Sequence, residues 1–199
     1  MRIERYNSTS AAEHVLAFID LYAEVYGVPP YAGDPFFSVD RYAERLADTM
    51  AMRGFEVVTA TVDDPLVGVG HGVTLPRDVA WWQNIKDSQP THLVEAAESG
   101  NIFWLRELQV RKVHRNMGIG RELHDYLRAG RSEAVTAMTV IVDSEPARSA
   151  YLRWGYKIIG QIRHAPESPL YDAMVQANTT PVANTRDQAG LNHRSLTLS

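Results

Sequence analysis

The segment from Asn101 to Arg131 constrains the fold more than any other part of this 199-residue chain. Its first ten residues, 101–110, carry apolar side chains at both odd and even positions, which is typical of a central strand covered on both sides. Gly118 and Gly120 then open a segment, 118–130, whose apolar residues recur at helical spacing. A strand that passes through a glycine turn into a helix predicts a β–α–β unit, and therefore some parallel strand pairing.

The remaining periodicities place this unit in one mixed α/β domain. A capping box at 10–13, Ser-Ala-Ala-Glu, and apolar residues at helical spacing predict a helix that ends at Gly27. A second helix is expected from Ser38 to Gly54. Further expected elements are a hairpin over 55–62 and 66–75, a strand over 135–142, a helix over 146–154, and strands over 156–163 and 171–177. We therefore expect an α/β domain with a mixed sheet over 1–177, an insert at 77–100, and a C-terminal tail or arm at 178–199.

Composition excludes several classes of protein. The chain has no cysteine, so it holds no disulfide, thiolate zinc site or cysteine nucleophile. Its seven histidines follow no metal-binding spacing such as His-Glu-x-x-His, and we expect no metal. The net charge of −4 gives no general attraction to nucleic acid or anionic lipid. No segment approaches the roughly 20 apolar residues that span a bilayer, and the N-terminus lacks a signal-peptide core, so a soluble cytoplasmic protein without a membrane partner is expected.

The loop between the strand at 101–110 and the helix at 118–130 predicts an anion site. Glycines let a ligand approach the backbone, and a helix N-terminus offers free N–H groups. From Arg111 to Arg131 there are six Lys/Arg and two Asp/Glu, a local charge of 6 − 2 = +4. The segment lacks the Gly-Lys-Ser/Thr of a P-loop, and Leu123 stands where a dinucleotide-binding fingerprint has its third glycine. A basic stripe for nucleic acid is the alternative, but the rest of the chain is acidic, so we expect no nucleic-acid partner.

Two motifs in this half of the chain point to a known family. The segment 115–120, Arg-x-x-Gly-x-Gly, follows a strand and resembles motif A of the GNAT superfamily, the acetyl-CoA-dependent N-acyltransferases. The segment 147–156, Ala-x-x-x-Tyr-x-x-x-Gly-Tyr, resembles the family's motif B. The layout of residues 1–177 is similar to the family's, and the motif match covers about 105–156. The resemblance implies a GNAT fold in a single domain, with acetyl-CoA as cofactor.

The resemblance also implies which residues hold the cofactor. Backbone N–H groups of the motif A loop would bind the pyrophosphate, and the pantetheine arm would lie between the strands that end at Val110 and Val142. A strand N–H between Leu108 and Val110 would stabilise the oxyanion. Ser144 departs from the family pattern, which often has Asn there and a side-chain contact to the arm. The residues expected to bind acetyl-CoA are Leu108, Val110, Arg115, Asn116, Met117, Gly118, Ile119, Gly120, Arg121 and Ser144.

Two residues are the candidates for proton transfer. Tyr151 occupies the place of a family tyrosine that protonates the leaving thiolate, and a phenol stays protonated at neutral pH. Glu107 is the expected base, because it is a lone acidic residue in an apolar strand and burial would raise its pKa. His71 is the alternative base. Each also has a structural interpretation: Tyr151 as a core aromatic, Glu107 as the partner of a neighbouring arginine, and His71 as an ordinary strand residue.

The acceptor site is predicted from aromatic residues outside the motifs. Tyr31, Phe36 and Phe37 lie in the loop between the first two helices, which often lines the acceptor pocket in this family; packing between the helices is the alternative. The full set expected to contact the acceptor is Tyr31, Phe36, Phe37, His71, Trp81 and Trp82, although packing of the insert also explains the two tryptophans. Residues 1–64 hold five Lys/Arg and eleven Asp/Glu, a local charge of −6, which would attract a cationic amine.

Together these features predict an N-acetyltransferase that moves an acetyl group from acetyl-CoA to a primary amine of a small molecule. Direct attack in a ternary complex is expected, because no cysteine exists to carry an acyl group. The alternative is a catalytically silent acyl-CoA-binding module that acts as a sensor or partner protein. Many members of the family are dimers, so a homodimer is an alternative to a monomer.

Overall fold

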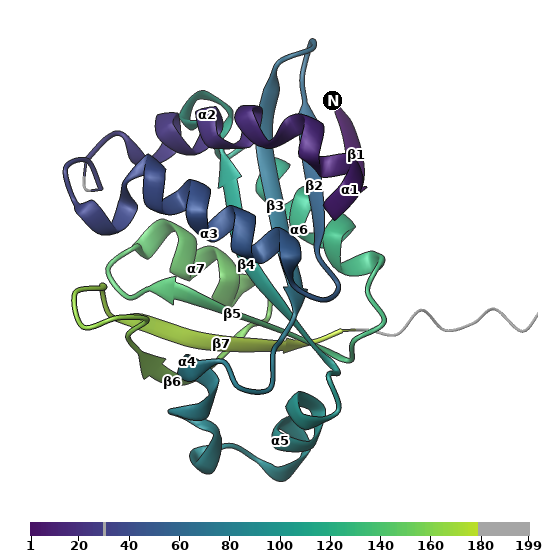
Figure 1. The fold of residues 1–199 in the computed structure, drawn as a ribbon, viewed down its shortest axis with the longest axis vertical. Helices are drawn as coiled ribbons and strands as arrows, with labels where there is room; N and C mark the ends of the chain where they lie inside the picture. The colour runs from purple at the N-terminus through teal and green to yellow at the C-terminus, as the bar shows by residue number, and fades with distance from the viewer. Residues whose placement is uncertain (30, 179–199) are drawn as a thin grey trace, which may run out of the picture.

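The computed structural model describes residues 1–29 and 31–178, and it has a seven-stranded sheet at its centre (Figure 1). The strand order is β1-β2-β3-β4-β5-β7-β6, and every neighbouring pair is antiparallel except β4 and β5. The strands are β1 (Arg2–Asn7), β2 (Glu56–Thr61), β3 (Leu66–Thr74), β4 (Ile102–Val110), β5 (Val135–Ile141), β6 (Lys157–Ile162) and β7 (Tyr171–Ala177). This architecture confirms the predicted mixed α/β class.

Helices cover both faces of the sheet. One face packs against α2, α3 and the segment that contains α4 and α5, and the other packs against α6 and α7. The helices are α1 (Ser8–Ala11), α2 (Val15–Tyr26), α3 (Val39–Ala51), α4 (Ala80–Gln83), α5 (Thr91–Glu98), α6 (Ile119–Ala129) and α7 (Glu145–Arg153), with 3₁₀ segments at Ala12–His14, Pro35–Phe37, Lys86–Ser88 and Lys112–His114. In the part of the chain described, no helix has the length and hydropathy that crossing a membrane requires.

The N-terminus differs from the sequence prediction. Residues Arg2–Asn7 form an edge strand paired with β2, where only a helix further along was expected. The capping box is formed by Asn7 and Ser10, not by Ser10 and Glu13. The strand has few apolar residues because it lies at the edge of the sheet, so its alternation is too weak to detect. Of the predicted tail at 178–199, all but Asn178 lies outside the described residues.

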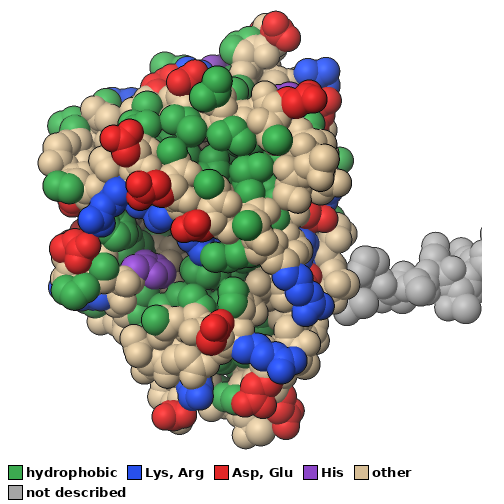
Figure 2. Space-filling model, in the orientation of Figure 1, with side chains coloured by type: hydrophobic (Ala, Val, Ile, Leu, Met, Phe, Trp, Pro, Cys, Tyr) green, Lys and Arg blue, Asp and Glu red, His purple; other side chains and the backbone are tan. Residues whose placement is uncertain are grey.

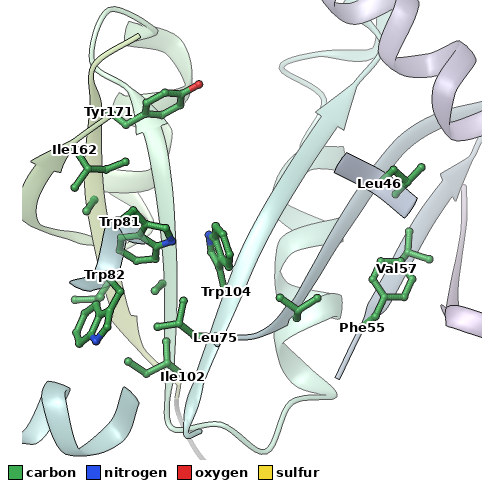
Figure 3. Packing of buried hydrophobic residues seen from close by; sticks show 14 of the residues in the cluster. Leu46, Phe55, Val57, Leu75, Trp81, Trp82, Ile102, Trp104, Ile162 and Tyr171 are labelled. Carbon is green, nitrogen blue, oxygen red and sulfur yellow. The ribbon is translucent and has the colours of Figure 1, made fainter. Parts of the chain in front are cut away.

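The insert at 77–100 packs into the larger of the two hydrophobic cores (Figure 3). Trp81 and Trp82 of α4 are each 2% exposed, and the ring of Trp81 lies 5.7 Å from that of Trp104 on β4. Gln89, between the insert's helices, donates through Nε2 to the Ile159 carbonyl of β6 at 3.0 Å. The insert therefore packs against β4 and β6 on this face of the sheet.

A β-bulge on β4 brings two consecutive charged residues to the same side. The pairing with β3 skips Arg106, so that residue is extra in its strand. Before the bulge, Trp104 packs into the core on the α2–α3 side. Glu107, after the bulge, hydrogen-bonds to α2, and the Arg106 guanidinium lies over the Trp104 ring on the same side.

Strands β4 and β5 separate at the same level. Their parallel pairing joins Ile102–Leu105 to Val135–Met138 and then stops, although β4 continues to Val110 and β5 to Ile141. Figure 1 shows the two arrows diverging from their common start. Because parallel neighbours normally remain hydrogen-bonded along their length, this separation leaves strand backbone open on both sides of a gap.

Replacing Trp82 by Ala tests the packing role of the insert. The substitution removes a fully buried side chain, so we expect a loss of about 3–5 kcal/mol in the free energy of unfolding, measured by urea denaturation. Leu16, which is 76% exposed, supplies the control: Leu16→Ala should change stability by less than about 0.5 kcal/mol. Equal effects of the two substitutions would contradict this account of the core.

Candidate functional site

A cavity of about 490 Å³ lies where β4 and β5 separate. Its walls include Leu105–Leu108 of β4 and Met138–Ile141 of β5. Side chains from α2, α3 and the loop between them form one end, and α7 forms part of the other. Figure 2 shows the surface hollowed on the α2–α3 side, with charged side chains at the edge and a histidine inside. The cavity therefore connects the two faces of the sheet through the gap between the strands.

Glu107 faces this cavity from the strand end just after the bulge. The hydroxyl of Tyr26 donates to Glu107 Oε1 at 3.1 Å. Burial raises the pKa of Glu107 to about 7, although the Tyr26 hydrogen bond and the charge of Arg45 favour the ionised form. The carboxyl group is thus poised to accept a proton near neutral pH.

Tyr151 lines the same cavity from α7, on the opposite face of the sheet. The residue is 8% exposed and packs edge-on against the rings of Trp154 and Tyr156. Burial, and then the negative charge of Glu107, hold the pKa of Tyr151 well above that of a free phenol. The hydroxyl therefore keeps its proton throughout the physiological range, as a general acid must before it acts.

The loop between α2 and α3 forms the aromatic wall of the cavity. Tyr31, Phe36 and Phe37 all line it, and the rings of Tyr31 and Phe37 lie 5.0 Å apart. Tyr26 stacks on Phe37 with ring centroids 5.6 Å apart. Ser144, at the start of α7, also lines the cavity, and its Oγ lies 3.4 Å from the Tyr31 hydroxyl. The predicted aromatic residues are thus brought together with both proton-transfer candidates.

Strand β4 leads out of the cavity into the glycine loop, which ends at the N-terminus of α6. Asn116 and Gly118 have φ of 61° and 86°, in the left-handed region that favours Asn and Gly. Gly118 is the N-cap residue, and among the described residues no side chain caps this helix end. A Cβ built on Gly118 would meet nothing within 4 Å. The loop therefore offers free backbone N–H groups toward open space, as a pyrophosphate site requires.

The side chains of this loop point in different directions. Arg115 turns back, and its Nε donates to the Val110 carbonyl at 3.0 Å. Ile119 is buried in the core and Met117 is 66% exposed. Arg121 Nε donates to Asp125 at 2.5 Å. The backbone, more than the side chains, is thus what this loop presents to a ligand. The fit to a CoA pyrophosphate rests on those N–H groups.

Three residues predicted to contact the acceptor lie elsewhere. Trp81 and Trp82 are buried in the core and are not among the residues that line the cavity. His71 is 3% exposed on β3 beside Glu107, but it does not line the cavity either. Burial lowers the pKa of His71 to about 3, so the ring is neutral and a weak base. The structure supports packing for the tryptophans and gives no support to His71 as the base.

Several residues of the cavity carry no motif in the sequence. Tyr26, in the predicted helix that ends at Gly27, bonds directly to Glu107. Arg45, Arg106 and His164 also line the cavity. The only signal was the pair Arg106-Glu107, two charges in an apolar strand, which is unusual for a covered central strand. In residues 1–29 and 31–178, no group of three or more His, Asp or Glu side chains is arranged to hold a metal ion.

Comparison with known proteins shows the fold alone. No family model and no curated protein matches the sequence. Among solved structures, the ribosomal-protein-S18-alanine N-acetyltransferase from Escherichia coli matches with a TM-score of 0.58 at 13% identity, over 92% of this chain and 97% of that one. Aminoglycoside 6′-acetyltransferase type Ii matches with a TM-score of 0.60 at 20% identity, over 91% and 99%. An acetyltransferase of the GNAT family from Streptococcus pneumoniae matches with a TM-score of 0.57 at 13% identity, over 89% and 99%.

Each of these likenesses covers about nine-tenths of this chain and nearly the whole of the neighbour. The chain therefore has the GNAT acetyltransferase fold.

Proposed function

We propose that this protein is an acetyl-CoA-dependent N-acetyltransferase that acts on a primary amine of a small molecule. One observation carries the proposal: the cavity between β4 and β5 brings Glu107 and Tyr151 together from opposite faces of the sheet. A base and an acid on opposite sides of a gap suit a reaction in which an amine attacks and a thiolate departs. The fold of the neighbours supports the same chemistry.

The glycine loop and the strand gap account for cofactor binding. Acetyl-CoA, when bound, supplies the acetyl thioester. Backbone N–H groups of 116–121 would hold its pyrophosphate at the positive end of α6. The backbones of β4 and β5 beyond Leu105 and Met138 would flank the pantetheine arm, since the polar groups that face the gap have no partner strand there. Ser144 contributes a hydroxyl to the lining of the same cavity.

Glu107 and Tyr151 divide the proton transfers. Glu107 removes a proton from the attacking amine, directly or through water, and its pKa of about 7 leaves it ionised above neutral pH. Tyr151 gives its proton to the departing thiolate. The Leu108 N–H donates to the Glu107 carboxylate and favours its ionised form. We infer transfer within a ternary complex, since the chain has no cysteine to carry the acetyl group.

A catalytically silent acyl-CoA-binding module of the same fold is the alternative function. The two functions differ in turnover, since a silent module binds CoA without releasing thiol from acetyl-CoA. The neighbours do not identify the acceptor of this chain, because one is named for an alanine of a ribosomal protein and another for an aminoglycoside.

The first prediction concerns cofactor binding. Acetyl-CoA should bind the wild-type protein with micromolar affinity by calorimetry. The double variant Gly118→Asp/Gly120→Asp places carboxylates where the pyrophosphate would lie, and it should weaken binding by at least about 30-fold, about 2 kcal/mol. Gly33→Asp is the matched control, because Gly33 has φ of 85° and a Cβ there also meets nothing within 4 Å. Absence of acetyl-CoA binding to the folded wild-type protein would contradict the acetyltransferase proposal.

The second prediction concerns pH. Glu107 must be ionised to act as base, and its raised pKa leaves about a tenth of it ionised at pH 6. The ratio of wild-type to Glu107→Gln kcat/KM should rise between pH 5 and 8 and level off above about pH 8, at about 100-fold. Taking this ratio cancels the effect of the acceptor amine's own titration, because that effect is the same for both proteins. Glu98→Gln, an exposed carboxylate of α5, is the control and should give a ratio near 1 at every pH. A flat ratio for Glu107→Gln would assign the base elsewhere.

The third prediction concerns the acid. Tyr151→Phe removes the hydroxyl with little change in packing, so kcat should fall by about 10- to 100-fold while the Kd for acetyl-CoA stays unchanged. Because the pKa of Tyr151 is raised, wild-type activity should show no decline from this group below pH 10. The exposed Tyr126 supplies the control variant, Tyr126→Phe, which should retain full kcat. An unchanged kcat in Tyr151→Phe would leave the tyrosine with a packing role only.

A further inference from the structure

The end of the cavity on the α2–α3 side carries two arginines that are not paired with a carboxylate in the part of the chain that the structure describes. Arg45 comes from α3 and Arg106 from the bulge of β4, and both line the cavity. Within the described residues, neither forms an ion pair. Nη1 of Arg45 donates to the Phe36 carbonyl at 3.1 Å, and Nη2 donates to the Tyr22 hydroxyl at 3.3 Å. The Arg106 guanidinium lies 4.1 Å from the Trp104 ring centroid.

Placing both charges in one cavity is costly without a counter-ion. Burial, and then the charge of Arg45, lower the pKa of Arg106 to about 10. A guanidinium withdrawn from water is normally compensated by a carboxylate or phosphate. Arg41, a turn before Arg45 on α3, shows the contrast: it is half exposed and pairs with Glu167 at 3.3 Å. Arg45 and Arg106 are fixed instead by neutral groups, which leaves their charge available to a ligand.

The other charged groups around the cavity do not cancel this excess. Two carboxylates line the cavity, Glu107 and the exposed Glu44, whereas Asp48 of α3 is exposed and does not line it. Burial lowers the pKa of His164 to about 4, so that ring is neutral. With Glu107 and Glu44 ionised, the three arginines and two carboxylates that line the cavity sum to 3 − 2 = +1. The expectation of an acidic acceptor site, drawn from the charge of residues 1–64, is therefore not supported.

We propose that the acceptor is a small amine that also carries a carboxylate, an amino acid with an apolar side chain, and that Arg45 and Arg106 bind its carboxylate. This proposal rests on the function proposed above. Guanidinium groups bind carboxylates through paired hydrogen bonds, and one carboxylate matches the +1 of the site. Glu107, next to Arg106 in the chain, is then close to the amino group. The aromatic wall of Tyr26, Tyr31 and Phe37 would contact the apolar side chain.

A pair of product analogues tests the charge requirement. N-acetyl-L-phenylalanine and its neutral amide, N-acetyl-L-phenylalaninamide, differ only in the group that the arginines would bind. Calorimetry on the CoA-loaded protein should give at least about tenfold tighter binding of the acid. Arg45→Gln and Arg106→Gln should each bring the acid-to-amide ratio of affinities close to 1, with the amide's Kd unchanged within about twofold. Arg77→Gln, an exposed arginine outside the cavity, is the matched control and should keep the wild-type ratio.

The same samples separate this proposal from the proposed function. The Kd for CoA reports on the cofactor site, and the melting temperature reports on folding. CoA binding together with equal affinity for acid and amide, or with no binding of either, would overturn the carboxylate proposal and leave the acetyltransferase proposal standing. Absence of CoA binding would overturn the acetyltransferase proposal, and the acid–amide pair is then measured on the free protein. If Arg106→Gln does not fold, the acid-to-amide ratio of affinities in Arg45→Gln decides whether the carboxylate proposal stands.

Discussion

The separation of β4 from β5 is the constraint on which the rest of the site depends. The two strands pair for four residues each and then diverge, so backbone groups that a sheet would normally satisfy are exposed in the middle of the domain. The bulge at Arg106 occurs at the same level and turns Arg106 and Glu107 toward α2 and α3. The gap and the bulge together produce a polar channel through a sheet that is otherwise covered by two apolar cores.

The electrostatics of the cavity follow from this geometry. A carboxyl and two guanidinium groups line one cavity, and burial together with the neighbouring charges shifts the pKa values of Glu107 and Arg106. Burial brings the pKa of Glu107 near neutrality, whereas it pushes that of Tyr151 further from it. One environment therefore yields a group that accepts protons and a group that keeps its proton, because desolvation penalises the charged form of both. The loop before α6 adds the proposed pyrophosphate site, and Asn116 and Gly118 hold left-handed conformations there that these two residue types adopt readily.

Much of the fold and of the candidate site could be predicted from the sequence, and the features that could not be predicted have physical causes. The strand–glycine loop–helix unit over 101–130 was predicted, because strong apolar periodicity and glycines encode it locally. Glu107 was noticed as a charge within an apolar strand, and Tyr151 through its motif. The edge strand β1 was missed because its residues are mostly polar. The bulge was missed because an extra residue is defined only by the partner strand, and Arg45 because α3 gains its place at the cavity from tertiary packing.

A crystal structure of the protein with acetyl-CoA would test the central claim most directly. The account predicts that the pantetheine arm lies between Leu105–Leu108 and Met138–Ile141, and that the pyrophosphate contacts backbone N–H groups of 116–121. It also predicts that the Tyr151 hydroxyl is the protein group nearest the sulfur. Acetyl-CoA bound away from the gap between β4 and β5, or a gap that closes with the two strands paired beyond Leu105, would contradict it.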